Sequence, residues 1–291
     1  MANLKEVRNR ISSVGSTMQI TSAMKMVSAA KLKRAQDAVV QLRPYATKLR
    51  GLLVNLSSNS DSGSVFSKKR DGKNILLIAV SSNRGLAGAF NSTIIKKVWS
   101  LVNNEYKDSK ITILCVGKKA NDIFRKTEYH IGGTDLPHHL NELFDGLNFE
   151  KVVPVVDKIM GAYSSGQFDQ VHLIYNQFKN AAVQICNVES FLPVQSTDAP
   201  EHKIHTDYIH EPAPETMVER LIPKMLRVQF YKALLDSVAS EHGARMTAMH
   251  KATDNARDML KELKISYNKV RQAAITKEIL EIVGGAEALS S

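Results

Sequence analysis

Apolar residues recur every three or four positions near the start of the chain, over a length that restricts the possible folds severely. The repeat comprises Leu4, Val7, Ile11, Val14 and Met18, then a drifting stripe through Met24, Val27, Leu32, Ala35 and Val39, and finally Leu42, Tyr45, Leu49, Leu52 and Leu56. Such spacing is typical of a coiled-coil helix. It predicts one helix over residues 3–57, roughly 80 Å long at about 1.5 Å per residue. Pro44 should kink or loosen this helix, because it removes a hydrogen-bond donor.

A second repeat of the same kind lies near the end of the chain and predicts a helix over 217–283. One seam position is filled by Met249, Ala256, Leu263 and Val270, and the other by Thr253, Leu260, Tyr267 and Ala274. Only Pro223 and Gly243 interrupt the pattern. Pro223 indicates either a kink or a helix start near residue 223.

A long helix with so narrow an apolar seam is not stable alone, so the two helices should pack on each other. An antiparallel pairing is the simplest topology, because a whole domain lies between the helices in the sequence and this pairing brings both of its junctions to one end. Linkers rich in Ser, Gly or Pro bracket that domain at 57–64 and 211–215.

Between the linkers, strand and helix patterns alternate. The expected strands are 75–80, 111–116, 170–175 and 183–188, and the expected helices are 88–106, 118–126 and 150–164. This alternation predicts a small, mostly parallel sheet covered by helices. The chain is therefore expected to be an α/β protein in which a long antiparallel coiled coil, residues 1–57 and 217–291, carries an inserted α/β domain, residues 65–212.

The charge is concentrated at the ends of the chain. The net charge is +10, and residues 1–57 hold ten Lys and Arg against two Asp and Glu. A basic surface favours an acidic partner, such as nucleic acid, anionic lipid or acidic protein loops, although an exposed helix face can carry the same charges. A basic coiled-coil protein that binds nucleic acid is therefore one hypothesis, but the cations are spread along the helix and only one Trp is present.

The segment SSNRGLAGAFN (81–91) is the best candidate for a phosphate site, because it follows a strand and opens a helix. It matches neither GxGxxG nor GxxxxGK[ST], so Gly85 and Gly88 are better explained by a tight turn. His202, His205 and His210 lie in a polar stretch with no common metal-ligand spacing. His138 and His139 follow a proline and indicate a turn.

Cys115 and Cys186 are the two cysteines, too few for a disulfide scaffold or a four-thiolate metal site, and both are expected to be small core residues. No GxSxG or HExxH motif occurs. We therefore expect no catalytic, cofactor-binding or metal-binding residues. The longest apolar run, residues 75–80, is too short to span a membrane, and no secretory signal is expected at the N-terminus.

Both ends of the chain carry long, specific motifs. The opening LKEVRNRISSVGSTMQITSAMKMVSAAKLKRAQ (4–36) with RPYA (43–46), and the closing ASEHGARMTAMHKATDNARDMLKELKISYNKVRQAAITKEILEIVGGAEAL (239–289), resemble the gamma subunit of F-type ATP synthase. The segment VSSNRGLAGAFN (80–91) is similar to the middle domain of that family. The resemblance covers essentially the whole chain and implies the central rotor stalk of the proton-translocating enzyme.

The resemblance implies a coiled coil on the axis of a ring of alpha and beta subunits, a Rossmann-like inserted domain, and no cofactor. Catalysis would belong to the beta subunits, which this chain would move as a rotary motor coupling ion transport to ATP synthesis. Further partners would be the epsilon subunit and the membrane rotor ring of c subunits, with neither nucleic-acid binding nor direct membrane insertion. A bacterial enzyme at the cytoplasmic side of the inner membrane fits best. The widely spaced cysteines do not form the redox pair of chloroplast relatives, so thiol regulation is not expected.

The resemblance also implies three contact regions. The residues matching those that touch acidic catch loops of the beta subunits are Arg271, Gln272 and Thr276, with Met24, Lys25 and Val27 expected on the facing helix. An apolar bearing tip over 279–291 includes Ile279, Ile282, Val283 and Leu289. The base, which would meet the epsilon subunit and the rotor ring, includes Arg43, Tyr45, Tyr208 and Glu211.

Overall fold

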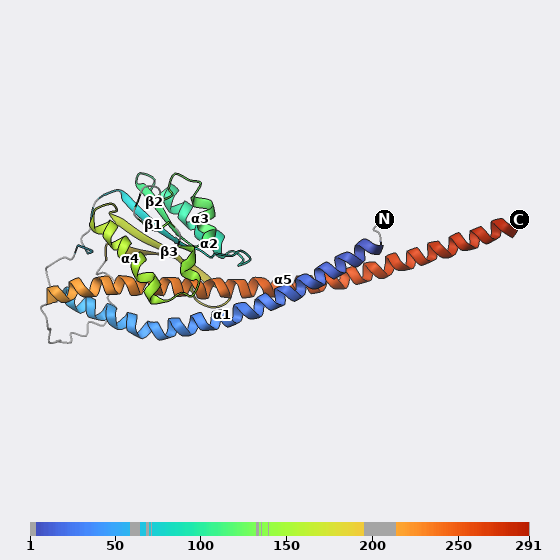
Figure 1. The fold of residues 1–291 in the computed structure, drawn as a ribbon, viewed down its shortest axis with the longest axis horizontal. Helices are drawn as coiled ribbons and strands as arrows, with labels where there is room; N and C mark the ends of the chain where they lie inside the picture. Colours follow the sequence, from blue (N-terminus) through green and yellow to red (C-terminus); the bar gives the residue numbers. More distant parts are fainter. Residues whose placement is uncertain are drawn as a thin grey trace. The chain divides into compact units, whose positions relative to one another are not determined.

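The computed structural model describes residues 4–58, 65–67, 70, 72–131, 134, 136–138, 140–194 and 214–290 (Figure 1). Two long helices, α1 (Leu4–Ser58) and α5 (Pro214–Ser290), enclose an α/β region in the sequence. The chain divides into two compact units, one made of Met1–Ser28 with Met246–Ser291 and the other of Ala29–Arg245. Each long helix therefore contributes to both units.

Both predicted long helices are confirmed, and the prolines do not end them. Helix α1 continues through Pro44, and α5 begins at Pro214 and continues through Pro223. A helix start near residue 223 is therefore wrong. Pro214 occupies the first turn, where a missing N–H leaves no helical bond unmade. Gly243 does not interrupt α5 either, and an ideal Cβ there would lie 3.3 Å from Cα of Ala181, so glycine allows the close approach of that backbone.

The second unit contains a four-stranded sheet in the order β2-β1-β3-β4. Its strands are β1 (Asn74–Val80), β2 (Lys110–Val116), β3 (Gln170–Phe178) and β4 (Gln184–Leu192). The first three neighbours run parallel, whereas β4 pairs antiparallel with β3. The predicted mostly parallel sheet is confirmed, although β3 and β4 extend beyond the expected 170–175 and 183–188.

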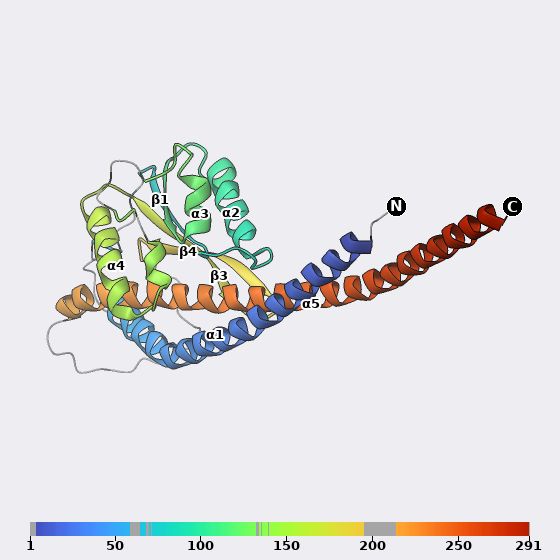
Figure 2. The ribbon, with the colours of Figure 1, turned by 45° about the vertical axis from the view of Figure 1, so that its right-hand side comes forward.

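Helices cover both faces of this sheet (Figure 2). Along β1, alternate side chains enter two different clusters, as the two-residue period of a strand requires. Leu76, Ile78 and Val80 pack with α4 (Phe149–Ser164) and with α5. The other set, Ile75, Leu77 and Ala79, packs with α2 (Phe90–Ser100) and α3 (Lys118–Phe124).

Part of α5 belongs to the core of the second unit. Its buried residues Ile222, Leu226, Phe230, Ala233 and Leu234 join the cluster with α4. The predicted domain limits, 65–212, were placed at the linkers, whereas the compact unit 29–245 also includes the α5 segment that covers the sheet. The sheet thus has an apolar layer on each side.

The three predicted shorter helices are also present. The expected helix over 88–106 corresponds to α2 followed by a π-helix, η1 (Leu101–Glu105), and those over 118–126 and 150–164 correspond to α3 and α4. A 3-10 helix, η2 (Asn141–Phe144), was not expected. Asn148 caps α4 by accepting a hydrogen bond from the backbone N–H of Lys151.

The turn after β2 depends on a glycine. Gly117 has φ 104° and ψ 147°, a region open essentially to glycine alone. We expect Gly117→Ala to lower the free energy of unfolding by about 1–3 kcal/mol through backbone strain alone. The loss should be larger still, because the new Cβ would meet the backbone carbonyl of Ser81. Thermal denaturation followed by circular dichroism measures the change.

Gly161→Ala is the matched control. Gly161 lies inside α4 and an added Cβ would meet nothing within 4 Å, so this change should stabilise the helix by about 0.5–1 kcal/mol. Equal stability of the two variants would contradict the explanation given for Gly117.

Candidate functional site: the two-helix shaft

In the first unit, the two long helices lie side by side (Figures 1 and 2). The predicted seam residues of α1 over 4–18 and of α5 over 249–274 are all buried or half-buried. The most enclosed are Val7, Met249, Thr253 and Ala256, each less than a tenth exposed. The heptad prediction is confirmed over these two ranges, where an apolar seam holds the helices together, whereas Tyr45 and Leu52 of the later α1 repeat are exposed.

Three contacts between side chains define how the helices are paired. Arg8 Nη2 donates to the hydroxyl of Tyr267 at 3.0 Å, and the Thr21 and Thr253 hydroxyls lie 2.9 Å apart. Lys25 Nζ lies 3.3 Å from Nδ1 of His250. Residues further along α1 therefore contact residues earlier in α5, and the two steps in residue number are nearly equal. This confirms the antiparallel pairing.

The predicted drift of the α1 stripe through Val27 is wrong. Val27 is 57% exposed, whereas Ser28 is buried and Thr21 and Lys25 are half-buried. The spacing of three and four thus continues unbroken from Met18, but with polar side chains in the inner positions. A search for apolar residues alone could not find them, although continuing the heptad count would have done so.

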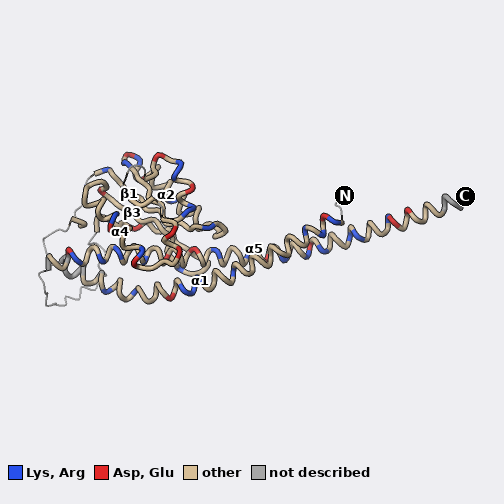
Figure 3. Tube along the Cα trace, in the orientation of Figure 1, with Lys and Arg blue, Asp and Glu red and all other residues tan. Residues whose placement is uncertain are grey.

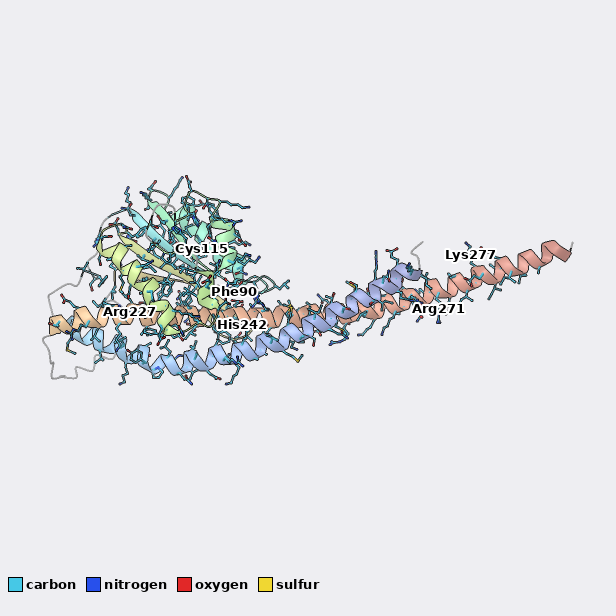
Figure 4. All side chains as sticks on the ribbon, viewed as in Figure 1. Phe90, Cys115, Arg227, His242, Arg271 and Lys277 are labelled. Carbon is cyan, nitrogen blue, oxygen red and sulfur yellow. The ribbon has the colours of Figure 1, made fainter. Side chains whose placement is uncertain are left out.

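The residues assigned to the catch-loop contact on α1 lie far along the shaft from those on α5. Arg271, Gln272 and Thr276 are exposed on α5, and Thr276 Oγ1 donates to the backbone carbonyl of Gln272 (Figure 4). In the observed register, Lys25 lies level with His250, so it is roughly 30 Å along α5 from Arg271. The expectation that Met24, Lys25 and Val27 face 271–276 is therefore wrong, because the antiparallel register brings the first residues of α1 to that level.

The end of α5 is a single exposed helix in the described part of the chain. All residues from 275 to 286 are exposed, including Ile279 at 54%, Ile282 at 71% and Val283 at 56%. The side chain of Leu289 lies outside the described residues. The ion pair between Lys277 and Glu281, 3.5 Å apart, is fully on the surface and contributes little. The tip therefore presents apolar side chains to its surroundings.

In the second unit, α5 is tied to the turn between β1 and α2. The Arg245 guanidinium is almost fully buried, pairs with Glu241 one turn earlier, and donates to the carbonyls of Arg84 and Gly85 at 3.2 and 3.3 Å. The predicted tight turn over 81–91 is confirmed, with Gly88 at φ 57° and Leu86 at φ 62°. Leu86 is 66% exposed, so this turn holds a leucine outward in a strained conformation.

Only part of the predicted base can be located. Arg43 is exposed, and Tyr45 is 43% exposed with Lys224 Nζ 5.8 Å from its ring centre. Tyr208 and Glu211 lie outside the described residues. So do His139 and the three histidines His202, His205 and His210.

The two cysteines lie on different strands of the sheet. Cys115 is on β2 and Cys186 is on β4, at opposite edges in the strand order. Burial raises the pKa of the Cys115 thiol to about 12 and also raises the pKa of Cys186. Neither thiol is activated, which agrees with their expected role as core residues.

Charged residues are spread along both helices (Figure 3). Within the described ranges, no group of three or more His, Cys, Asp or Glu side chains is placed to hold a metal ion. None of the described helices combines the length and the apolar character that crossing a membrane requires. What the geometry offers is a two-stranded helix pair with exposed surfaces.

Comparisons with known proteins agree over the whole chain. The family model described as ATP synthase matches residues 3–289. An ATP synthase gamma chain of Christiangramia forsetii is 56% identical over 292 residues, and that of Flavobacterium johnsoniae is 54% identical, each covering 100% of both chains. The chain belongs to the ATP synthase gamma chain family.

Solved structures support the same fold. A chain of the Euglena gracilis mitochondrial ATP synthase, in the structure of OSCP, F1 and c-ring, has a TM-score of 0.72 at 23% identity, with 98% of this chain and 94% of that chain covered. A chain of the Tetrahymena thermophila central stalk and c-ring has a TM-score of 0.56 at 25% identity, covering 80% and 99%. As a gamma chain, the protein is a central-stalk rotor subunit, and catalysis lies on other subunits of the complex. Nothing in the comparisons favours the nucleic-acid hypothesis.

His242, in the second unit, gives the gamma chain a predictable response to acid. Burial, together with Arg245 and Lys31, lowers the pKa of His242 to about 4. Between pH 6.5 and 4 the unfolded chain binds a proton that the folded chain does not, so the stability contributed by neutral His242 is present above pH 6.5 and is lost as the pH falls.

We therefore expect His242→Gln to lose less stability than the wild-type chain between pH 6.5 and 4.5, as measured by the melting temperature. The raised pKa of Glu241 acts in the opposite direction and is common to both proteins, so the comparison isolates the histidine. Parallel melting curves for both proteins over this range would refute the assignment.

Proposed function

We propose that this chain rotates inside a ring of alpha and beta subunits and transmits torque between the membrane rotor ring and the catalytic beta subunits. The observation that carries the proposal is the antiparallel seam of the first unit, with cross-helix contacts at Arg8–Tyr267, Thr21–Thr253 and Lys25–His250. A paired helix resists bending and twisting better than one marginally stable helix. The chain would then couple ion flow to ATP synthesis or hydrolysis.

Arg271 and Gln272 are the proposed contacts for acidic loops of the beta subunits. Both side chains are exposed on α5 and can reach a partner. Hydrogen bonds between a guanidinium and a carboxylate are directional and each contributes about 1.5–3 kcal/mol. Such bonds can hold the rotor at defined angles and still break at each step. Thr276, one turn further along α5, would contribute beside Gln272, and Met24 and Lys25 would contribute at another level of the shaft.

The exposed tip is the proposed bearing. Ile279, Ile282 and Val283 are each more than half exposed, which favours burial against an apolar surface in the complex. Apolar contacts are not directional, so a tip that turns against such a surface meets only shallow angular barriers. Leu289 would continue this surface.

The base is the proposed contact with the epsilon subunit and the rotor ring of c subunits, through Arg43, Tyr45, Tyr208 and Glu211. The exposure of Arg43 and Tyr45 supports this for the described part of the set. We place the chain peripherally at the cytoplasmic side of a bacterial inner membrane, held there by these partners.

Reconstitution tests the proposal. Alpha and beta subunits are purified, mixed with or without this chain, and assayed for ATP hydrolysis. The rotor function predicts much faster turnover with the chain present. Turnover no faster than that of alpha and beta alone would reject it.

We expect Arg271→Glu combined with Gln272→Ala to impair coupling much more than folding, because the reversed charge would repel acidic loops. In inverted membrane vesicles, ATP-driven proton pumping should fall at least about tenfold, which corresponds to the loss of about 1.4 kcal/mol. The melting temperature of the chain should change little, because both side chains are exposed.

Lys264→Glu is the control, since Lys264 is an exposed cation on the same helix outside the proposed contact. It should leave pumping near the wild-type level. Wild-type pumping in the double variant, or an equal loss in both, would remove the contact assignment.

A further inference from the structure

Two of the three cross-helix contacts lie next to each other and place polar groups in the seam of the first unit. They join Thr21 to Thr253 at 2.9 Å within the seam and Lys25 to the exposed His250 at 3.3 Å beside it. We call these four residues the polar layer. Thr253 is only 7% exposed, so its hydroxyl lies where the rest of the seam is apolar.

Each threonine hydroxyl has two hydrogen-bond partners, a backbone carbonyl of its own helix and the hydroxyl of the other threonine. Thr21 Oγ1 can donate to the carbonyl of Met18 at 3.1 Å, and Thr253 Oγ1 to that of Met249 at 2.8 Å. Each hydroxyl has one hydrogen, so a hydrogen bond crosses the seam when one hydroxyl donates to the other and the second donates to its own helix. In that arrangement both hydrogens are used and one bond joins the helices, whereas two hydroxyls that both donate within their own helices leave this level of the seam without a hydrogen bond.

We propose that the polar layer, assisted by Arg8 and Tyr267, fixes the axial register of α1 against α5, so that these are positioning residues of the shaft. A polar residue in an inner heptad position commonly selects the register of a coiled coil at some cost in stability. Only the consequence for torque rests on the proposed function. The register itself is a property of this chain.

The apolar part of the seam cannot select the register by itself. Its inner positions repeat every seven residues, from Leu4 to Met18 on α1 and from Ala256 to Ala274 on α5. Sliding one helix by one heptad, about 10 Å, places apolar residues opposite apolar residues again. Such a slip would change the packing within the seam itself little if the seam were uniformly apolar.

The polar groups make both one-heptad slips unfavourable. In one direction Thr21 would lie level with Leu260, and Lys25 would lie level with Arg257, a like charge. The Asp254 carboxylate would not compensate, because it already pairs with Arg257 at 2.8 Å and lies 3.4 Å from His250.

The slip in the other direction is also disfavoured. It would place Thr21 level with Met246 and Arg8 level with Leu260, so that both cross-helix bonds of these side chains are lost. Of these three registers, only the native one keeps the cross-helix bonds of Thr21, Lys25 and Arg8.

Disulfide trapping in the full chain, assembled with alpha and beta subunits, tests the proposal. Val14→Cys with Leu260→Cys reports the native register. Ile11→Cys with Val270→Cys reports the slip in one direction, and Val7→Cys with Leu260→Cys the slip in the other. Mild oxidation should cross-link only the native pair in the otherwise wild-type chain.

Each pair is then placed in a chain in which the polar layer is apolar and the Arg8–Tyr267 bond is removed, carrying Thr21→Val, Thr253→Val, Lys25→Met and Tyr267→Phe. We expect at least one slipped pair to cross-link at more than a tenth of the native yield. Thr17→Val with Lys251→Met is the control, because it changes the same residue types at exposed positions. It should give the native pair alone.

A single native cross-link in the apolar-layer chain would overturn the proposal and show that the register is set elsewhere. If that chain does not assemble, Thr253→Val alone replaces it, with Thr253→Ser as the variant that keeps the hydroxyl. Slipped cross-links must then appear with valine and not with serine, and equal patterns for the two would also overturn the proposal. Failure of the chain to stimulate alpha and beta would reject the proposed function but leave these cross-link patterns unaffected.

Discussion

The seam between two antiparallel helices is the interaction on which the shaft depends. Neither helix has an apolar face broad enough to stabilise it alone, so each needs the other as its partner. The seam is narrow because it contains only two inner positions per heptad, and this leaves most of each helix surface available for other subunits. Val7, Met249 and Ala256 show how closely these inner positions are enclosed.

The mechanical load on the shaft explains why the seam must fix the register of the two helices as well as hold them together. Moving one charge through 100 mV releases about 2.3 kcal/mol, so several ions supply on the order of ten kcal/mol per synthetic step. A uniformly apolar seam could relax under such a load by sliding, because apolar contacts are not directional. Hydrogen bonds at Thr21–Thr253 and Arg8–Tyr267 are directional, and they join the helices at two separate levels.

Much of the architecture was predictable because it follows from periodicity. The repeat through Thr253 and Tyr267 identified the α5 seam before any contact was known, and the apolar run over 75–80 identified the central strand. The inner position of Lys25 was missed because hydrophobicity alone favoured Val27. The start of α5 at Pro214 was missed because Pro223 gave an equally plausible first turn.

Long-range placement was the harder part. The level of Arg271 along the shaft depends on the register, which is set by contacts between residues more than two hundred positions apart. The hydrogen bonds from Arg245 to the carbonyls of Arg84 and Gly85 could not be predicted from the sequence, since a lone arginine in a helix is usually exposed. The contact roles of Arg271 and of the tip came from family resemblance, since an exposed arginine or isoleucine on a helix does not by itself indicate a partner.

The central claim is that α1 and α5 of the first unit turn as one body, and a staple between them tests it most directly. Val14→Cys with Leu260→Cys is oxidised within the assembled complex, and ATP hydrolysis is compared before and after reduction. The account predicts equal turnover in the stapled and reduced forms, because the staple joins two parts of a single rotor. A stapled complex that stops, and recovers on reduction, would show that the helices must move against each other and would contradict the account.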